Sequence, residues 1–298
     1  NQKRRETCTI SMAAGAKTAA HENSWKSEDW TVVLPRRGKQ RKTCPKRMGV
    51  REQEQSWFPT EMESDPDREL KLMQKITVCL QKLEGSQFYR TFLNQTQTPQ
   101  FLDPLKRILG SESKVPMVIY GIGSIESFEN PRLQLCLAIQ MKTKFSWIGD
   151  VEVFDPVLSK TESRVLQSLG CTVLSRNEHG QRQASRPTMF FMPHCEANLY
   201  DNLLRANWRV DLLQRIVLFG NSFWVYEQFV AEFKNSAVVD SIGHILAARR
   251  FTCEIHISVA SDDYFEAFHG SCWQFFSPGS EVELQPGVGA LEGAAKYS

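Results

Sequence analysis

An apolar run meets a glycine-containing turn in the stretch Val115-Pro116-Met117-Val118-Ile119-Tyr120-Gly121-Ile122-Gly123-Ser124. The continuous apolar residues predict a buried strand over 115–120, and the glycines predict a turn directly after it. Glycine lets the backbone approach a phosphate or carboxylate closely, and free N–H groups at the start of a helix bind anions. The next helix is predicted to begin only at Asn130-Pro131, so this turn is longer than a simple strand-to-helix connection.

Strands and helices continue to alternate along the chain. Further strands are predicted at 150–154, 171–174, 188–192, 216–219 and 252–259. Helical periodicity or helix caps separate consecutive strands except those at 171–174 and 188–192, and Ser159-Lys160-Thr161-Glu162 is a capping box. Such alternation indicates parallel strands covered on both faces. The sequence therefore predicts an α/β fold, a three-layer Rossmann-like and mainly parallel sheet with helices on both faces. The strand at 252–259 alternates polar and apolar residues, which places it at an edge.

The chain is predicted to have four parts. They are a disordered basic arm over 1–64, a helical lead-in and connector over 65–114, the α/β domain over 115–276, and a frayed tail over 277–298. In the lead-in, Pro66–Glu84 is predicted to be a helix with Asp65 as N-cap. Residues 94–114, with Pro99 and Pro104, are expected to form a connector with room for one short helix.

Charge is unevenly distributed. The 298 residues hold 36 Lys and Arg against 34 Asp and Glu, a net charge of +2, which excludes a uniformly basic nucleic-acid coat or a highly acidic chaperone. Residues 1–51 alone carry a net charge of +9. Basic clusters attract polyanions, so this arm is interpreted either as a solvated tail, as a nuclear-import signal or as a weak nucleic-acid contact.

The eight cysteines contain no C-x-x-C pair, which argues against a zinc ribbon and a redox motif of the thioredoxin type. No metal site is predicted, because His194 and Cys195 would need ligands from distant loops and none is visible at helical spacing. Reduced thiols fit the cytoplasm, and the basic arm leaves the nucleus open as a second location. Cys44-Pro45 matches the dipeptide of haem-regulatory segments, so Cys44 is a candidate haem ligand.

The ends of the chain carry no sign of membrane targeting. No apolar run reaches the roughly 18 residues that span a bilayer, and the polar N-terminus is unlike a secretory signal. Met12, followed by Ala13-Ala14-Gly15, resembles a translation start, which would put residues 1–11 outside the native protein.

Polar residues gather where the predicted strands end. Because ligands of open α/β sheets bind beyond the carboxyl ends of the strands, these residues are the candidate ligand-binding set. They are Gly121, Gly123, Ser124, Asp155, His194, Glu196, Asn207, Asn221 and Ser222. Glu126 stands where the dinucleotide motif G-x-G-x-x-G needs its third glycine, which disfavours a nicotinamide site but leaves another nucleotide-like ligand open. For each of these residues a turn or a helix cap is the alternative interpretation.

Pro193-His194-Cys195-Glu196 is the densest group of reactive side chains. A thiolate near a protonated imidazole or a helix N-terminus is a nucleophile, which makes His194 and Cys195 the catalytic candidates. A structural histidine beside a buried cysteine explains the same residues, because consecutive side chains point in different directions.

Several uncommon sequence motifs occur in order over residues 115–270, and with them the chain resembles the sensitivity-to-red-light-reduced (SRR) family, its animal members most closely. The motifs are Tyr120-Gly121-Ile122-Gly123-Ser124, Gln134-Leu135, Phe154-Asp155-Pro156, Pro193-His194-Cys195-Glu196, Leu199-Tyr200-Asp201-Asn202, Leu204-Arg205-Ala206-Asn207-Trp208 and Gly220-Asn221-Ser222-Phe223. The family often has Phe-Asn-Asp-Thr-Ser where this chain reads Phe268-His269-Gly270-Ser271-Cys272, which weighs against a site role for that loop.

The resemblance implies a regulatory protein, tied to circadian clock gene expression and to control of haem biosynthesis. It implies no catalytic reaction, and no catalytic motif in the chain is complete, so a non-enzymatic role through a ligand- or partner-binding rim is favoured. Two alternatives stay open. One is an enzyme of methyltransferase or nucleotide-handling type that uses the same rim, and the other is an interaction module whose basic arm binds protein partners or nucleic acid.

Overall fold

The computed structural model describes residues 57, 59, 63, 65–232, 242–259, 262–279 and 284. Cys44 and almost all of the predicted basic arm lie outside them. The helices and strands follow one another in the order α1 (Pro66–Gly85), α2 (Gln87–Gln95), α3 (Pro99–Leu109), β1 (Val115–Tyr120), α4 (Glu129–Lys144), β2 (Ile148–Phe154), α5 (Lys160–Ser168), β3 (Cys171–Val173), β4 (Thr188–Met192), α6 (Ala197–Ala206), α7 (Val210–Leu213), β5 (Ile216–Asn221), α8 (Phe223–Glu232), α9 (Gly243–Ala248), a short 3-10 helix (Arg249–Phe251), β6 (Thr252–His256), α10 (Asp262–Phe268) and β7 (Ser271–Phe276).

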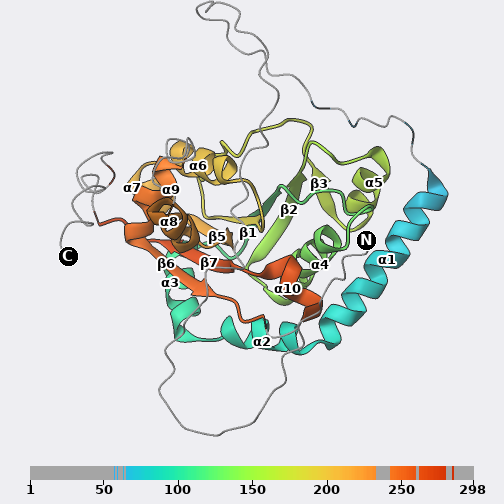
Figure 1. The fold of residues 1–298 in the computed structure, drawn as a ribbon, viewed down its shortest axis with the longest axis horizontal. Helices are drawn as coiled ribbons and strands as arrows, with labels where there is room; N and C mark the ends of the chain where they lie inside the picture. Colours follow the sequence, from blue (N-terminus) through green and yellow to red (C-terminus); the bar gives the residue numbers. More distant parts are fainter. Residues whose placement is uncertain are drawn as a thin grey trace, which may run out of the picture. The chain divides into compact units, whose positions relative to one another are not determined.

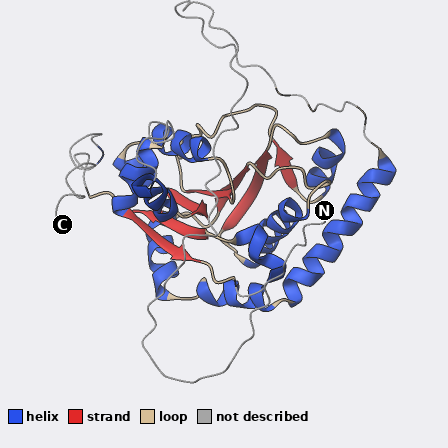
Figure 2. Ribbon diagram, in the orientation of Figure 1, coloured by secondary structure: helices blue, strands red, loops and turns tan. Residues whose placement is uncertain are grey.

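The strands form one seven-stranded sheet in the order β3-β2-β1-β4-β5-β7-β6. Every neighbouring pair is parallel except the two that β7 makes with β5 and β6. Helices lie on both sides of the sheet (Figures 1 and 2). The predicted Rossmann-like, mainly parallel three-layer fold is confirmed, and the strand predicted at an edge is β6, which ends the sheet.

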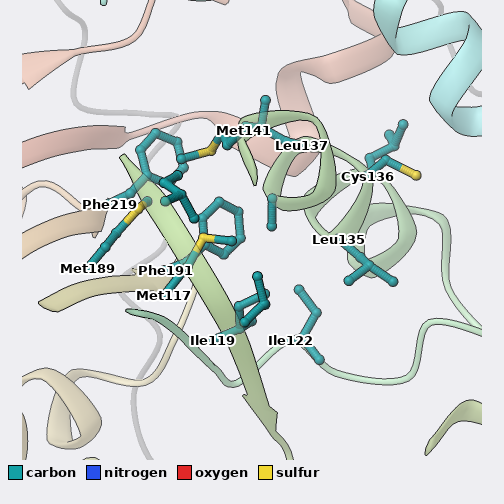
Figure 3. Close-up of a cluster of buried hydrophobic side chains, with 14 of the residues drawn as sticks. Met117, Ile119, Ile122, Leu135, Cys136, Leu137, Met141, Met189, Phe191 and Phe219 are labelled. Atoms are coloured by element: carbon teal, nitrogen blue, oxygen red, sulfur yellow. The ribbon is translucent and has the colours of Figure 1, made fainter. Parts of the chain in front are cut away.

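Successive residues of the central strands point to opposite faces, as the period of a strand requires. Met117 and Ile119 of β1 face a core that includes α4 and the lead-in helices, and Figure 3 gives a close-up of part of it. Val118 and Tyr120 face a second core formed with α6, α7, α8 and α9. Both faces are fully covered, which explains why the sequence of β1 is apolar without alternation.

The lead-in is more helical than the sequence predicts. Residues 94–114 contain the end of α2 and the whole of α3, although Pro104 stands inside α3 and cannot donate a helical hydrogen bond. Burial of Phe101, Leu105 and Ile108 along one side of α3 outweighs that lost bond. Strand β7 was not predicted, because Gln274 interrupts its apolar run.

Two residues outside the central domain are fixed to it. Trp57, within the predicted arm, donates its backbone N–H to the carbonyl of Ser175 at 2.6 Å, and its ring packs edge-on against Phe154. Leu284, within the predicted frayed tail, is buried and accepts a hydrogen bond from the indole of Trp208.

The lead-in helices are predicted to contribute to the stability of the whole domain. Phe92 of α2 is 1% exposed, and its ring centroid lies 5.9 Å from that of Trp273 in β7. Phe92→Ala should lower the free energy of unfolding by about 3–5 kcal/mol, measured by urea titration. Leu70→Ala, at a position of α1 that is 60% exposed, is the control and should change it by less than about 0.5 kcal/mol. Equal effects of the two substitutions would mean that the lead-in is not part of the core.

Candidate functional site

The carboxyl ends of β2, β1, β4 and β5 bring most of the predicted site residues to one edge of the sheet. These strands are neighbours and run parallel. Gly121 and Gly123 follow β1, Asp155 follows β2, His194 follows β4, and Asn221 is the last residue of β5. We call Gly121–Ser124, Asp155, His194–Glu196 and Asn221 the carboxyl-edge site.

The glycine turn allows two loops to meet. Gly121 and Gly123 both have left-handed backbones, with φ of +64° and +76°. A Cβ on Gly121 would lie 2.6 Å from Sγ of Cys195, which is closer than real side chains approach. The loop after β1 can therefore lie against the loop after β4 only with glycine at this position.

Asp155 holds the glycine turn by accepting hydrogen bonds from the backbone. Its Oδ2 accepts the backbone N–H of Gly123 at 2.8 Å, and its Oδ1 accepts that of Val157 at 2.9 Å. Burial of the carboxyl raises its pKa, and the two hydrogen bonds oppose that effect. Both oxygens accept hydrogen bonds within the protein, so the geometry favours the interpretation of Asp155 as a turn residue over that of a ligand contact.

Glu162 is the second carboxylate that holds this loop, and it was not among the predicted site residues. It is 1% exposed. Its Oε1 accepts from the Ser124 hydroxyl at 2.7 Å and from the backbone N–H of Glu126 at 2.9 Å, while its Oε2 accepts from the N–H of Ser159. The capping box at the start of α5 was visible in the sequence, but nothing there indicated that its glutamate also reaches the loop after β1.

The side chains of Asn221 and Tyr200 join the ends of β4 and β5. Asn221 accepts the backbone N–H of His194 at 2.7 Å through Oδ1 and donates through Nδ2 to the carbonyl of Cys195 at 3.3 Å. The hydroxyl of Tyr200 donates to the carbonyl of Met192 and accepts the N–H of Asn221. These bonds hold His194 in a left-handed conformation with φ of +56°, which is uncommon for a residue other than glycine.

The ring of His194 is neutral and faces His269. Its Nε2 lies 3.1 Å from the carbonyl oxygen of His269, and the two rings are 4.6 Å apart. Because a carbonyl only accepts, Nε2 carries the proton and Nδ1 keeps a free lone pair as an acceptor. Desolvation lowers the pKa of His194 to about 4, although the bond to His269 opposes it. The loop containing His269 therefore contacts the site, although its departure from the family pattern argued against such a role.

Cys195 is enclosed by the protein. Its side chain is 3% exposed, and the thiol donates to the carbonyl of Tyr120 at 3.1 Å. Burial raises its pKa well above the ordinary value, and the charges of Asp155 and Glu196 add to this effect. A protonated, enclosed thiol is a poor nucleophile, so the geometry favours the structural interpretation of Cys195 over the catalytic one.

Of the remaining candidates, Glu196 is exposed and Ser222 is buried. Glu196 is exposed as the N-cap of α6, and its side chain caps no backbone group. Ser222 is buried and donates to Glu254, whose carboxylate also accepts the N–H of Phe223 at the start of α8. The carboxylate of Glu254 thus occupies the start of α8.

Asn207 does not join the carboxyl-edge site. It follows the far end of α6, is 0% exposed, and bonds to the backbone of Ala184, Arg182 and Leu203. Its side chain therefore fixes the loop before β4 against α6.

Among the described residues, no three or more His, Cys, Asp or Glu side chains are grouped so that they could hold a metal ion. No helix in this part of the chain has both the length and the apolar character needed to cross a membrane.

The fold and the edge define a Rossmann-like α/β protein with a polar site beyond its parallel strands. Residues 101–275, which include the whole carboxyl-edge site, match the family described as SRR1 domain. The protein SENSITIVITY TO RED LIGHT REDUCED 1 of Arabidopsis thaliana is 53% identical over 266 residues, which cover 88% of this chain and 96% of that protein. The chain belongs to the SRR1 family.

Two further comparisons give weaker likeness. The SRR1-like protein of Mus musculus is 39% identical over 161 residues, covering 51% of this chain and 63% of the mouse protein. The Arabidopsis protein is thus more similar to this chain than the mouse protein is, and over a longer stretch. The animal members were expected from the sequence motifs to be the more similar ones. A solved structure titled "Crystal Structure of MtNAS in complex with MTA and tNA" aligns with a TM-score of 0.35 and 13% identity over 71% of each chain.

The pH dependence of stability tests the environment of His194. Because its pKa is lowered on folding from 6.5 to about 4, its contribution is present above pH 6.5 and is lost as the pH falls to about 4. The loss is at most about 3 kcal/mol. His194→Asn, which tolerates the left-handed backbone, should lose less free energy of unfolding than the wild type over that interval in urea titrations. His179→Asn, at the other left-handed histidine, is the control and should keep the wild-type slope. Identical slopes for wild type and His194→Asn would contradict the buried, neutral imidazole.

Proposed function

We propose that this protein is a regulator whose carboxyl-edge site binds a small, nucleotide-like molecule, and that it acts in control of circadian clock gene expression and haem biosynthesis. Family membership supports the regulatory role. The name of the plant relative speaks of sensitivity to red light, which is consistent with a part in light or rhythm signalling. Binding at this edge is supported by the general position of ligands in open α/β sheets.

The observation that carries the proposal is that hydrogen bonds within the protein hold the loops of the edge in place. Asp155 and Glu162 hold the glycine turn, and Asn221 with Tyr200 holds the loop of His194. A site whose loops are already fixed loses little conformational entropy on binding. These hydrogen bonds connect the loops at one edge of the sheet. They indicate one continuous, fixed surface and not a set of unrelated turns.

The chemistry of the free groups indicates the kind of ligand. Nδ1 of His194 is an acceptor, and the carboxylate of Glu196 is an exposed acceptor with a negative charge. Both favour a ligand that presents hydroxyl or amino donors, such as the ribose or base of a nucleoside. A highly charged phosphate is less favoured beside Glu196.

Binding without turnover is the better-supported form of the proposal. Cys195 is enclosed and protonated, and a histidine whose pKa is about 4 is a weak base at neutral pH. Neither of the catalytic candidates is thus activated for proton transfer or nucleophilic attack.

A methyltransferase-like or nucleotide-handling enzyme is the second candidate. It is favoured by one observation, the antiparallel β7 inserted between β5 and β6, an arrangement also found in Rossmann-like methyltransferases. This is an analogy of fold and not of site chemistry. In such an enzyme Gly121, Gly123 and Asp155 would surround the cofactor, and His194 or Asn221 would face the substrate.

The proposal also includes residues outside the described ones. Cys44 is proposed to contact haem, and residues 1–51 are proposed to bind nucleic acid or protein partners weakly. The proposed location is the cytoplasm, with the nucleus as a second location.

Ligand-dependent thermal unfolding tests the proposal. The full chain is heated alone and with S-adenosylmethionine, adenosine, ATP or haemin. A ligand at 100 times its Kd should add about 2.7 kcal/mol of stability and raise the midpoint by several degrees. His194→Asn should remove most of that shift, and His179→Asn should keep it.

The outcomes separate the two candidate functions. A shift without consumption of the ligand supports the regulator, whereas methyl transfer or hydrolysis that is lost in His194→Asn would replace it with the enzyme. If none of the four compounds shifts the midpoint at millimolar concentration, a nucleotide-like ligand at this edge is contradicted. A haemin shift that survives His194→Asn and disappears in Cys44→Ala would support Cys44 as the haem contact.

A further inference from the structure

A groove lies between α1 and the beginning of α4, two helices that pack side by side (Figure 1). Its volume is about 540 Å³. Residues of α1 form one side of this α1–α4 groove. The other side is formed by the loop after β1 and by the first turn of α4, through Glu126, Glu129 and Arg132. The groove lies outside the carboxyl-edge site, and the proposed function assigns no role to it.

The α1–α4 groove is positively charged. Five cationic side chains and two carboxylates line it, which leaves a surplus of three positive charges. Three of the cationic side chains are Lys71, Lys75 and Lys82 of α1, and all three are exposed. Because an α-helix has 3.6 residues per turn, lysines at these spacings lie on one face of α1. That face is the one that lines the groove.

The three lysines have no counter-ion within the described part of the chain. The carboxylates of α1 that form ion pairs do so with other helices. Glu69 lies 3.6 Å from Arg164 of α5, and Glu84 lies 3.6 Å from Lys144 near the end of α4. The positive charge of the lysines is thus available to an anionic partner from outside the protein.

The opposite side of the groove reduces this charge only in part. Both oxygens of Glu126 accept hydrogen bonds from Arg68 of α1, at 2.9 and 2.7 Å, so this carboxylate is already paired. Arg132 donates through Nη1 to the carbonyls of Ile125 and Glu126, at 2.8 and 2.9 Å, and carbonyls leave its charge unneutralised. Three lysines and one fixed arginine therefore face the single remaining carboxylate, that of Glu129.

The groove also presents apolar surface to water. Val78 lies between Lys75 and Lys82 on the same face of α1, lines the groove and is 49% exposed. Phe128, next to Glu129 at the start of α4, is 64% exposed. Apolar side chains that stay exposed and are surrounded by charged ones are typical of surfaces that bind other proteins.

We propose that the α1–α4 groove binds an acidic segment of a partner protein. Carboxylates of that segment pair with the lysines of α1 and with Arg132, and one of its apolar side chains packs on Val78. A peptide fits this groove better than a nucleic acid, because Glu129 repels phosphates and Val78 offers no hydrogen bond or charge to a sugar–phosphate backbone. Opposite charge speeds association, and the buried apolar side chain adds affinity.

The groove borders the loop of the carboxyl-edge site. Glu126 lines the groove, and its backbone N–H donates to Glu162, which also accepts the hydroxyl of Ser124. A partner segment in the groove would therefore lie beside the loop that Glu162 holds. The inference itself needs no ligand at the carboxyl edge, so it is tested separately from the proposed function.

Fluorescence anisotropy of a labelled peptide of repeated Glu-Glu-Leu, titrated with the full chain at low salt, tests the proposal. Lys75→Glu combined with Lys82→Glu should weaken binding at least about tenfold, because two attractions become repulsions. Lys106→Glu combined with Lys114→Glu is the matched control. It changes the net charge equally at exposed positions outside the groove and should keep the affinity within about twofold.

The apolar contact is tested with the same peptide. Val78→Ala should weaken binding by about threefold, because part of the buried apolar area is lost. Leu70→Ala removes an exposed apolar side chain of α1 that does not line the groove, and it should leave the affinity unchanged. Circular dichroism confirms that each variant is folded.

Four outcomes would overturn the proposal. They are no binding of the peptide at low salt, and equal loss of affinity in the two double variants, which would mean that only net charge attracts the peptide. The third is a single-stranded RNA that binds more tightly than the peptide and is lost in Lys75→Glu with Lys82→Glu, which would assign the groove to nucleic acid. The last is a dimer of the protein alone that this double variant dissociates in sedimentation velocity, which would assign the groove to a second copy.

Discussion

Two buried carboxylates hold the loop on which the carboxyl edge depends. Asp155 accepts the N–H of Gly123, and Glu162 accepts the hydroxyl of Ser124 and the N–H of Glu126. A buried acceptor whose oxygens all have donors is stable in a protein interior, whereas an unpaired one is strongly unfavourable. The loop therefore cannot move away from the ends of β1 and β2 without leaving one of these carboxylates unpaired. In the same way, hydrogen bonds of the Asn221 and Tyr200 side chains hold the ends of β4 and β5 together. The ends of β2, β1, β4 and β5 therefore form one connected surface.

Much of this arrangement was predictable from local sequence patterns. The strands at 115–120 and 188–192 have the predicted bounds, because each is a short apolar run ended by a turn signal. The capping box of α5 and the edge position of β6 were also predictable, since both are encoded within a few residues. From parallel strands it followed that Gly123, Asp155, His194 and Asn221 share an edge, and they do.

The remaining features depend on contacts between residues far apart in the chain. Glu162 reaches Ser124 across 38 positions, and Asn207 turns toward Ala184 and away from the edge. Neither direction is encoded in a motif. Helix α3 forms around Pro104 because tertiary burial outweighs a lost hydrogen bond, which local propensity does not predict. The enclosure of Cys195 likewise follows from its packing against Gly121, in a loop 74 positions earlier.

Amide hydrogen exchange at Gly123 in the ligand-free protein tests the central claim most directly. With Asp155 as its acceptor, this N–H should exchange about as slowly as the amides of β1. In Asp155→Ala it should exchange as fast as an open loop, while Val118 and Val153 of the neighbouring strands stay protected. Fast exchange at Gly123 in the wild type, or unchanged protection in Asp155→Ala, would contradict an edge that is held in place by its own buried carboxylates.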